Sequence, residues 1–332
     1  MSELFDVGKM EQSINKAKRR STWKTVLITV TVLTIGGIVG VFLNRTVTPL
    51  MEQPIADSFH LFNQISGANE FISTMEAFPG LFGGEHHYKT YKLIEGKVVY
   101  TGEDGYGYGL FRNEWLGRIG MRSPIIFGGA YSEDNLEYVQ YNVLGQRQMT
   151  FFYPLLSYEH ASNDLALLDE IGDDKVMEMA LSFDQGYTSS EAMELIPKTV
   201  TKTWLWVNDV DEKDEIQAKS FNEDGEIIAK TNLLRNENTV FGFSILTPNG
   251  DKAEMPAENF IGSISSGTKY RTIWQDEFKR LNETISGEDG VLSVADLEIY
   301  GAVVTGTAES LATLKDLPFI KASSLGIVVD KY

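Results

Sequence analysis

Cysteine is absent from the 332-residue sequence. Disulfide bonds and cysteine-ligated metal sites are therefore excluded. Histidine is also scarce, with four residues in the chain, of which His86 and His87 are adjacent. Glu85 precedes them, but no further ligand follows at a spacing typical of a metal site. We therefore interpret this segment as a polar loop and predict neither a metal nor a cofactor.

Signatures of catalysis are missing as well. The sequence contains no G-x-S-x-G and no H-E-x-x-H motif. Gly105, Gly107 and Gly109 alternate with tyrosines, but a phosphate-binding loop would require a following helix and, in a P-loop, a Lys-Ser/Thr pair. A glycine-rich hairpin is the simpler interpretation. The sequence therefore predicts a protein that is not an enzyme.

Positive charge is in short supply and unevenly placed. The chain has 29 Lys and Arg against 47 Asp and Glu, a formal net charge of −18. Direct binding to nucleic acid is therefore not expected. Five of the basic residues gather in KAKRRSTWK, residues 16–24, and the next run, TVLITVTVLTIGGIVGVFL at residues 25–43, carries no charge at all.

The uncharged run has the length of a membrane span. At about 1.5 Å per residue, residues 25–43 make roughly 28 Å of helix, close to the ~30 Å of a hydrocarbon core. Many of these residues are β-branched, but in lipid a lone strand cannot satisfy its own backbone, whereas a helix can. A cleaved signal peptide is disfavoured because no A-x-A-like site follows. We predict a single transmembrane helix.

The charges on either side of the span predict its orientation. Because Lys and Arg next to a span stay in the cytoplasm, residues 1–24 are expected to form a cytoplasmic basic stub. The rest of the chain is expected to lie outside the cell membrane. Within the span, Gly36 and Gly40 form a G-x-x-x-G pair, which can let two helices pack closely and so form a homodimer.

The stub carries a narrow apolar stripe. Leu4, Val7, Met10 and Ile14 recur every three or four residues, which is the spacing of one helix face. Two interpretations remain open. The stub is either a basic amphipathic segment lying on anionic lipid or a docking helix that binds a cytosolic protein through these four residues.

Residues 44–160 are predicted to form a membrane-proximal helix followed by a β-meander. Residues 48–79 have helical character, with expected breaks at Pro49, Pro54, Gly67 and Pro79. Beyond them, apolar and polar residues alternate as in antiparallel strands up to about residue 154. Turns are expected at Glu95-Gly96, Asp104-Gly105 and Leu144-Gly145.

Residues 161–332 are predicted to form an α+β domain with two β-α-β-like units. The helix of the first unit opens with a capping box, Thr188 and Glu191, and the last 36 residues repeat the same order. Between the units, a helix over residues 270–287 places Trp274, Phe278, Leu281 and Ile285 on one face. Trp204 and Trp206 share one face of a strand, which is typical of core packing. We therefore expect helices on one face of a sheet, an α+β class of fold.

Three strings in this region resemble the extracytoplasmic C-terminal domain of membrane-anchored sigma-factor regulators. They are MALSFDQGYTSSEAMELIPKTVTKTWLWVN at 179–208, VFGFSI at 240–245 and IYGAVVTGTAESLATLKDLPFIKASSLGIVVDKY at 299–332. The span, its basic lead and the segment after it resemble the N-terminal regulator domain of the same proteins. Among such regulators, the sequence resembles the anti-sigma-M type of Gram-positive bacteria.

The resemblance implies an anti-sigma factor. An inner segment would hold an extracytoplasmic-function sigma factor inactive at the membrane, and the outer domain would sense the state of the cell envelope. Larger members carry a longer cytosolic region than the roughly 24 residues here. This leaves open whether the stub binds the sigma factor directly or acts with a second anti-sigma subunit. The His-x-x-x-Cys-x-x-Cys zinc pattern of many other anti-sigma proteins is absent.

A second function is compatible with the same sequence. The chain could be a membrane-anchored surface module that binds a cell-envelope ligand and has no role in transcription. The two hypotheses differ in what the stub is for. Only the regulator requires the apolar stripe of residues 4, 7, 10 and 14 to contact a protein.

Overall fold

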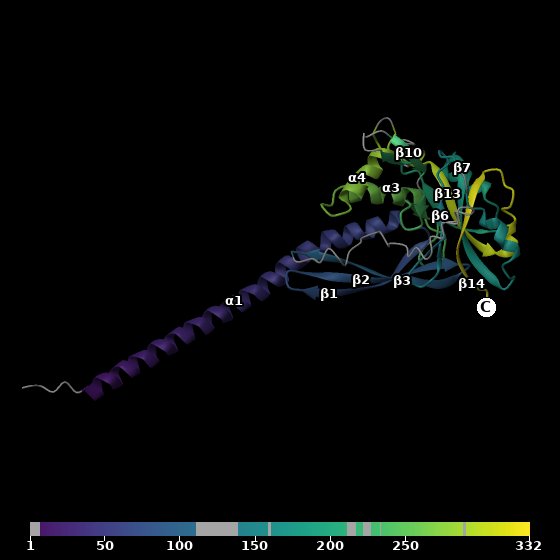
Figure 1. Cartoon of the computed structure of the whole chain (residues 1–332). Helices are drawn as coiled ribbons and strands as arrows, with labels where there is room; N and C mark the ends of the chain where they lie inside the picture. Colours follow the sequence, from purple (N-terminus) through teal and green to yellow (C-terminus); the bar gives the residue numbers. More distant parts are fainter. Residues whose placement is uncertain are drawn as a thin grey trace, which may run out of the picture.

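The computed structural model describes residues 7–110, 139–158, 161–210, 217–221, 227–232, 234–287 and 290–332. Its shape is a folded head on a long helical stalk (Figure 1). The stalk is the amino-terminal part of helix α1 (Val7–Ile65), which has 59 residues. Side chains along residues 8–39 are exposed, whereas the carboxyl-terminal end of the same helix enters the head.

Helix α1 continues without interruption past both of its prolines. The breaks predicted at Pro49 and Pro54 are therefore wrong. An interior proline costs a helix about 3 kcal/mol, because it removes one backbone hydrogen bond and crowds the preceding turn. Phe59, Phe62 and Ile65 follow on the buried face of the helix, and each fully buried side chain of this kind contributes about 1.5–3 kcal/mol. Core packing thus offsets the cost of the prolines.

The helix ends just before Gly67, where a break was predicted. Gly67 has a φ of 80°, a conformation that glycine adopts without steric cost. The next segment, however, is not helical. Residues expected to continue the helix to position 79 form strand β1 (Glu70–Gly80) instead. β1 pairs along its length with β2, and this tertiary pairing outweighs local helical preference.

A three-stranded antiparallel sheet follows α1, in the order β1-β2-β3. It comprises β1, β2 (Gly83–Ile94) and β3 (Lys97–Gly109). The turn predicted at Glu95-Gly96 is confirmed, with both residues at positive φ. The turn predicted at Asp104-Gly105 is wrong, because β3 runs straight through it. A Cβ on Gly105 would lie 2.7 Å from the carbonyl oxygen of His86, so glycine permits the close approach of β2.

The carboxyl-terminal half is built on a five-stranded sheet in the order β12-β8-β13-β7-β14, with all neighbours antiparallel. Two helices connect strands within it: α2 (Ser189–Leu195) joins β7 to β8, and α5 (Ala308–Ala312) joins β13 to β14. The strands are β7 (Lys175–Tyr187), β8 (Thr201–Val207), β12 (Gly242–Ser244), β13 (Ile299–Thr307) and β14 (Ile320–Asp330).

Both predicted β-α-β units are present, and they interlock. β13 lies between β7 and β8, and β7 lies between β13 and β14. Each unit is thus a split β-α-β, whose two parallel strands are separated by a strand of the other unit. The α+β class is confirmed. The capping box at the start of α2 is confirmed as well, because the Thr188 hydroxyl accepts from Glu191 N and the Glu191 carboxylate accepts from Thr188 N.

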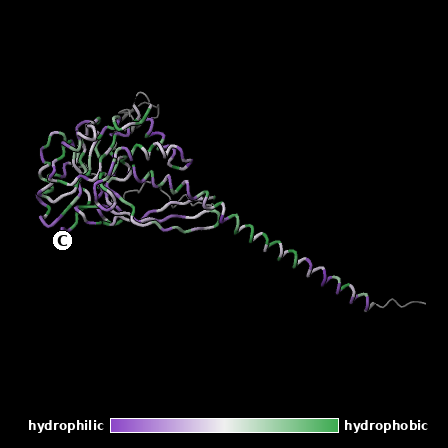
Figure 2. Tube along the Cα trace, turned by 180° about the vertical axis from the view of Figure 1, so that it is seen from behind, coloured by the Kyte–Doolittle hydropathy of each residue, from purple (hydrophilic) through white to green (hydrophobic). Residues whose placement is uncertain are grey.

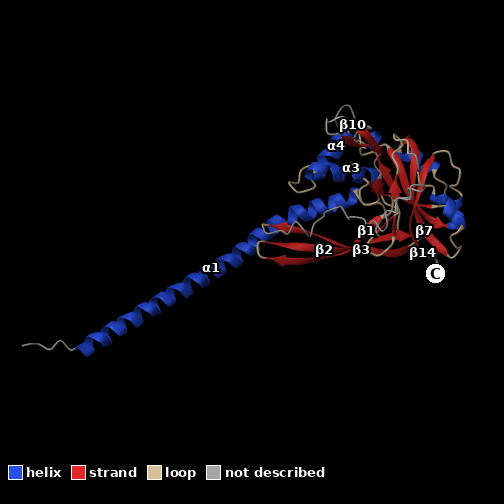
Figure 3. Ribbon diagram, viewed as in Figure 1, coloured by secondary structure: helices blue, strands red, loops and turns tan. Residues whose placement is uncertain are grey.

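Two further helices, α3 (Pro256–Gly267) and α4 (Gln275–Ile285), pack on the head beside the end of α1 (Figure 3). The helix predicted over 270–287 corresponds to α4, and its predicted apolar face is buried. α3 was not predicted. Shorter elements complete the described chain: β4 (Gln140–Tyr141), β5 (Arg147–Gln148), β6 (Thr150–Phe151), η2 (Asp164–Asp169), β9 (Gln217–Phe221), β10 (Ile227–Asn232), β11 (Arg235–Asn236) and η4 (Val294–Asp296).

One hydrophobic core joins the end of α1 and the β1-β2-β3 sheet to the carboxyl-terminal half of the chain. It contains Phe59 of α1, Tyr88 of β2 and Phe278 of α4, together with many residues of the five-stranded sheet. A second cluster contains Trp204 and Trp206 with residues of β6 and β13, so these tryptophans are core residues as predicted. This first core crosses the expected domain boundary at residues 160/161. The β1-β2-β3 sheet, called the membrane-proximal sheet below, and the five-stranded sheet therefore pack as one body.

Phe59 lies at the centre of the joint between α1 and the head, and its truncation should be costly. Its ring centroid lies 4.8 Å from that of Tyr88, 4.6 Å from that of Tyr106 and 5.8 Å from that of Trp274. Phe59→Ala should destabilise the head by about 3–5 kcal/mol and lower its Tm by on the order of 10 °C. Near-UV circular dichroism of the full chain in detergent measures this. His60→Ala, at the exposed neighbouring position, should leave Tm almost unchanged.

Candidate functional site

The structure describes only part of the predicted stub face. Leu4 lies outside the described residues, and Val7 is the first residue of α1. Met10 and Ile14 lie one helical turn apart on α1, with exposed fractions of 57% and 56%. The head does not cover this face. Met10 and Ile14 are therefore helical and accessible, and the role of the stripe in binding a partner stays a prediction.

The stub and the predicted span form one straight run of helix. α1 passes from the basic cluster into residues 25–43 without a break, and the 18 residues from 7 to 24 extend roughly 27 Å beyond the span. Figure 2 shows the hydrophobic middle of the stalk and its hydrophilic amino-terminal end. The apolar stripe is thus presented along a rigid rod that is continuous with the span.

Polar groups inside the span are satisfied within the helix. The Thr31 hydroxyl donates to the Leu27 carbonyl at 2.8 Å, and the Thr34 hydroxyl donates to the Val30 carbonyl at 2.8 Å. Such bonds remove the cost of placing a hydroxyl in hydrocarbon. In the described part of the chain, α1 alone is long and apolar enough to cross a membrane.

The G-x-x-x-G face of the span is open. No atom of the described residues outside the local helix lies within 4 Å of a Cβ built on Gly36 or Gly40. A second helix could therefore approach this face closely. Pairing of two copies through Gly36 and Gly40 stays a prediction.

Beyond the span, one face of α1 carries a row of polar contacts to the membrane-proximal sheet. We call Asn44, Thr48 and Glu52, which lie four residues apart, the polar ladder. Asn44 Oδ1 accepts from the backbone N–H of Phe82, and the Thr48 hydroxyl donates to Asn44 Oδ1 at 3.0 Å. Glu52 Oε1 lies 2.8 Å from His86 Nε2. The ladder fixes the rotation of α1 against β2.

Two tyrosines of β3 lie beside the ladder. Burial, followed by the negative charge of Glu52, raises the pKa of Tyr106 and of Tyr108. The phenols therefore stay neutral. Tyr106 stacks on the His86 ring with centroids 5.1 Å apart. The alternation of glycine and tyrosine in this segment, which lies within strand β3, places the tyrosines on the face towards α1.

The two adjacent histidines do not form a common site. They lie within strand β2, so the predicted loop is wrong. Successive strand residues face opposite sides: His86 pairs with Glu52, whereas the His87 ring lies 3.2 Å from Glu85 Oε2. Among the described residues, no three His, Asp or Glu side chains are arranged to hold a metal ion.

A buried ionic triad connects the two sheets. Lys92 Nζ lies 2.7 Å from Glu178 Oε1 and 2.9 Å from Glu237 Oε2, and all three side chains are buried. Asn69 Nδ2 also donates to Glu178, and the backbone N–H of Met149 donates to Glu237. Two carboxylates thus share one ammonium group in a water-poor site.

The triad has a titratable member. Burial raises the pKa of Glu237 to about 7; the charge of Glu178 adds to this shift, and Lys92 opposes it. No motif in the sequence pointed to the triad. Glu178 within the apolar strand KVMEMALSF was the available signal, because a lone charge in a buried strand requires a partner.

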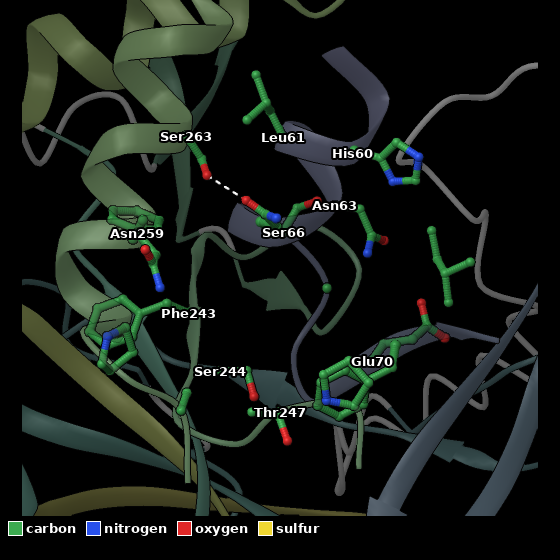
Figure 4. A pocket seen from close by; sticks show the side chains of 18 of the residues that line it. His60, Leu61, Asn63, Ser66, Glu70, Phe243, Ser244, Thr247, Asn259 and Ser263 are labelled. Carbon is green, nitrogen blue, oxygen red and sulfur yellow. Dashed lines mark hydrogen bonds between the residues drawn. The ribbon is translucent and has the colours of Figure 1, made fainter. Parts of the chain in front are cut away.

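A pocket of about 900 Å³ opens between the end of α1, β1, α3 and the segment around β12. In Figure 4, the amides of Asn63 and Asn259 project from opposite walls, and Glu70, Ser244 and Thr247 line the floor. A hydrogen bond of 2.7 Å from the Ser263 hydroxyl to Gln64 Oε1 joins α3 to α1 at the rim. The lining combines amides and hydroxyls with apolar side chains and two carboxylates. No motif in the sequence indicated this pocket.

Comparison with known families agrees with this architecture. A model described as sigma factor regulator N-terminal matches residues 11–99, and one described as sigma factor regulator C-terminal matches residues 168–327. The chain belongs to the sigma factor regulator family. The two matches together take in most of the chain. Comparisons with curated proteins and with solved structures gave no match.

Membership of this family supports an anti-sigma factor role, with a sigma factor as the partner. The N-terminal match includes most of the stub, the span, the polar ladder and the first two strands. The C-terminal match includes four strands of the larger sheet and the fifth, β14, up to residue 327. Both matched domain types are regulatory rather than catalytic.

The titration of Glu237 should make the stability of the head depend on pH. Its pKa in the folded state lies above its ordinary value of 4.5, so the folded head retains a proton that the unfolded chain loses. Stability should therefore fall as pH rises from about 4.5 to about 7, by on the order of 3 kcal/mol. Chemical denaturation at several pH values measures this.

The matched variants are Glu237→Gln and Glu309→Gln, the second at an exposed position. Glu237→Gln should flatten the pH dependence between pH 5 and 8, because glutamine cannot titrate. Glu309→Gln should keep the parental profile. A Glu237→Gln profile as steep as that of the parental chain would contradict this account of the triad.

Proposed function

We propose that the chain is a single-pass anti-sigma factor of the cell membrane that holds an extracytoplasmic-function sigma factor on the cytoplasmic side and senses the cell envelope with its head. The observation that carries the proposal is the course of α1, a single helix from an exposed basic stub into the core of the head. It runs through a chain matched at both ends to sigma factor regulators.

Charge supports the proposed orientation. The basic residues of 16–24 precede the span, and the net charge of the whole chain is −18. The positive-inside rule then places residues 1–24 in the cytoplasm, residues 25–43 in the membrane and residues 44–332 outside. Trp23, with an exposed fraction of 73%, lies where an interfacial aromatic anchor is expected.

The stub has the features of a docking helix. Met10 and Ile14 offer an exposed apolar stripe, which Val7 and Leu4 extend towards the amino terminus. An apolar helix face of this kind binds in a hydrophobic groove of a partner. The basic residues that follow would suit an acidic rim on that groove. The tether keeps the bound sigma factor at the membrane and away from DNA.

The mode of action follows from the joint between α1 and the head. The core of the head and the polar ladder both contact α1 directly. A conformational change in the head would therefore reach the stub as a rotation or displacement of this helix. A short helix offers little contact area to a sigma factor. Pairing of two copies through Gly36 and Gly40 would add to this area, and so would a second anti-sigma subunit beside the stub.

A second function, binding of a cell-envelope ligand without a role in transcription, is favoured by one observation. The pocket of about 900 Å³ is lined by amides and hydroxyls together with apolar side chains and the carboxylates of Glu70 and Glu258. Such a mixed lining suits a ligand that has both polar and apolar groups. In the regulator, the same pocket would be the sensing site. The two functions differ in the effect of disrupting the stub. Regulation of the sigma factor is lost if the chain is a regulator, whereas a ligand-binding module keeps its function.

Disruption of the stub face should release the sigma factor. Met10→Asp with Ile14→Asp places two charges in the proposed interface and removes two apolar contacts. We expect binding to weaken on the order of 100-fold or more, because each buried apolar side chain contributes about 1.5–3 kcal/mol. Co-purification from detergent-solubilised membranes and a reporter of the sigma regulon measure the loss.

The matched control is Gln12→Asp with Asn15→Asp, which adds the same charge on sides of the helix that point away from Met10 and Ile14. This control should retain the sigma factor and keep the reporter silent. If both double variants behave as the parental chain does, the stub is not a docking helix and the ligand-binding function is favoured.

The proposed orientation can be tested with single cysteines, because the parental chain has none. Glu309→Cys on the head and Ser13→Cys on the stub are both exposed positions. A membrane-impermeant maleimide should label the first in intact cells and the second only after lysis. The reverse pattern would place the head in the cytoplasm.

A further inference from the structure

The tip of the β1–β2 hairpin reaches back along α1 to the end of the span. The hairpin lies beside α1 and points towards the amino-terminal half of that helix (Figure 1). We call residues 78–82 the hairpin tip. The Asn44 side chain makes two hydrogen bonds to the hairpin tip: its Oδ1 accepts from Phe82 N, and its Nδ2 donates to the Gly80 carbonyl at 3.4 Å. Asn44 follows directly after residues 25–43.

The hairpin tip exposes large apolar side chains. Phe78 and Leu81 have exposed fractions of 53% and 66%. Leu110, with an exposed fraction of 65%, joins them, because its backbone N–H donates to the Phe82 carbonyl at 2.9 Å. Three such side chains at one end of a sheet form an apolar patch that water solvates poorly.

We propose that the hairpin tip docks into the outer leaflet of the lipid bilayer, at the boundary between headgroups and acyl chains. The proposal rests on the placement of residues 25–43 in the membrane. If residue 43 ends the span, two hydrogen bonds to residue 44 hold the tip at the depth where hydrocarbon gives way to headgroups. Phe78, Leu81 and Leu110 would then be in contact with lipid.

Neighbouring polar groups limit the depth of insertion. Glu85 pairs in register with Phe78, and Arg45 follows Asn44 on α1. Neither charge would enter hydrocarbon without a large cost. A shallow position suits both, since the carboxylate remains hydrated and the guanidinium can contact lipid phosphate. The tip is thus an interfacial anchor and does not span the membrane.

The turn itself is held in an uncommon conformation. Phe82 has a φ of 55°, which is rare for a bulky residue and is retained only where surrounding contacts require it. The hydrogen bond from its N–H to Asn44 is such a contact. The head would therefore be attached to the membrane at two points, the span and the hairpin tip. A change in lipid packing would act on β1 and β2 directly and on α1 through Asn44.

The depth of the hairpin tip can be measured with nitroxide labels in proteoliposomes. Single cysteines are introduced as Leu81→Cys at the tip and as Val143→Cys and Ile38→Cys as references. Val143 is as exposed as Leu81, at 68%, and it packs beside Gly102 of β3, away from the tip. Ile38 lies within the span and is 65% exposed. For each label, the rate of collision with oxygen, which concentrates in lipid, is divided by the rate of collision with a water-soluble nickel chelate. A high ratio indicates that the label lies in lipid.

We expect the oxygen-to-nickel ratio at Leu81→Cys to lie several-fold above that at Val143→Cys and below that at Ile38→Cys. A ratio equal to that at Val143→Cys, with Ile38→Cys in lipid, would overturn docking of the tip and leave the span intact. A ratio at Ile38→Cys as low as that of a label in water would overturn both the span and the docking of the tip. Dipolar broadening between labels at the tip, with protection from both reagents, would show contact between two copies and would also overturn the proposal.

Discussion

The whole structure depends on the continuity of one helix through three surroundings. α1 must satisfy its own backbone hydrogen bonds where lipid is expected, present an apolar stripe in the stub, and supply Phe59, Phe62 and Ile65 to the core of the head. No hinge separates these tasks. The head therefore cannot rotate about the span without opening the core that both sheets share. This gives a mechanical basis by which the head can influence the stub at the other end of α1.

The contacts along α1 change character with distance from the span. The first turns outside residues 25–43 carry the polar ladder, and later turns carry aromatic core residues. A single hydrogen bond contributes about 0.5–1.5 kcal/mol, whereas truncation of a buried phenylalanine costs about 3–5 kcal/mol. Movement of the sheet relative to α1 would therefore begin at the ladder, next to the membrane. The buried triad at the far end of β2 keeps this sheet attached to the larger one.

Charge and local pattern predicted much of this architecture. An uncharged run after a basic cluster predicted the span, and the capping box of Thr188 and Glu191 predicted the start of α2. Alternation of apolar and polar residues predicted β2 and the turn at Glu95-Gly96. The predicted order of strands and helices in residues 161–332 contained two β-α-β units, and the structure adds that they are split and interlocked.

Features that depend on distant contacts could not be predicted. Pro49 and Pro54 are local signals for a break, but the packing of Phe59, Phe62 and Ile65 further along the helix outweighs them. β1 is a strand because β2 pairs with it. The triad joins residues 92, 178 and 237, and the pocket draws its walls from three separate segments. Each is a consequence of the fold, so no local pattern in the sequence encodes it.

The distance between two nitroxide labels on α1 tests the central claim most directly. Ser21→Cys and His60→Cys are exposed positions on either side of the span and of both prolines. In a continuous helix they are separated by about 58 Å. Pulsed electron–electron double resonance is measured in proteoliposomes, with labelled chains diluted by unlabelled ones. The distances between the two labels should form one narrow distribution near this value. A broad distribution centred well below it would show that α1 is broken and would contradict the account.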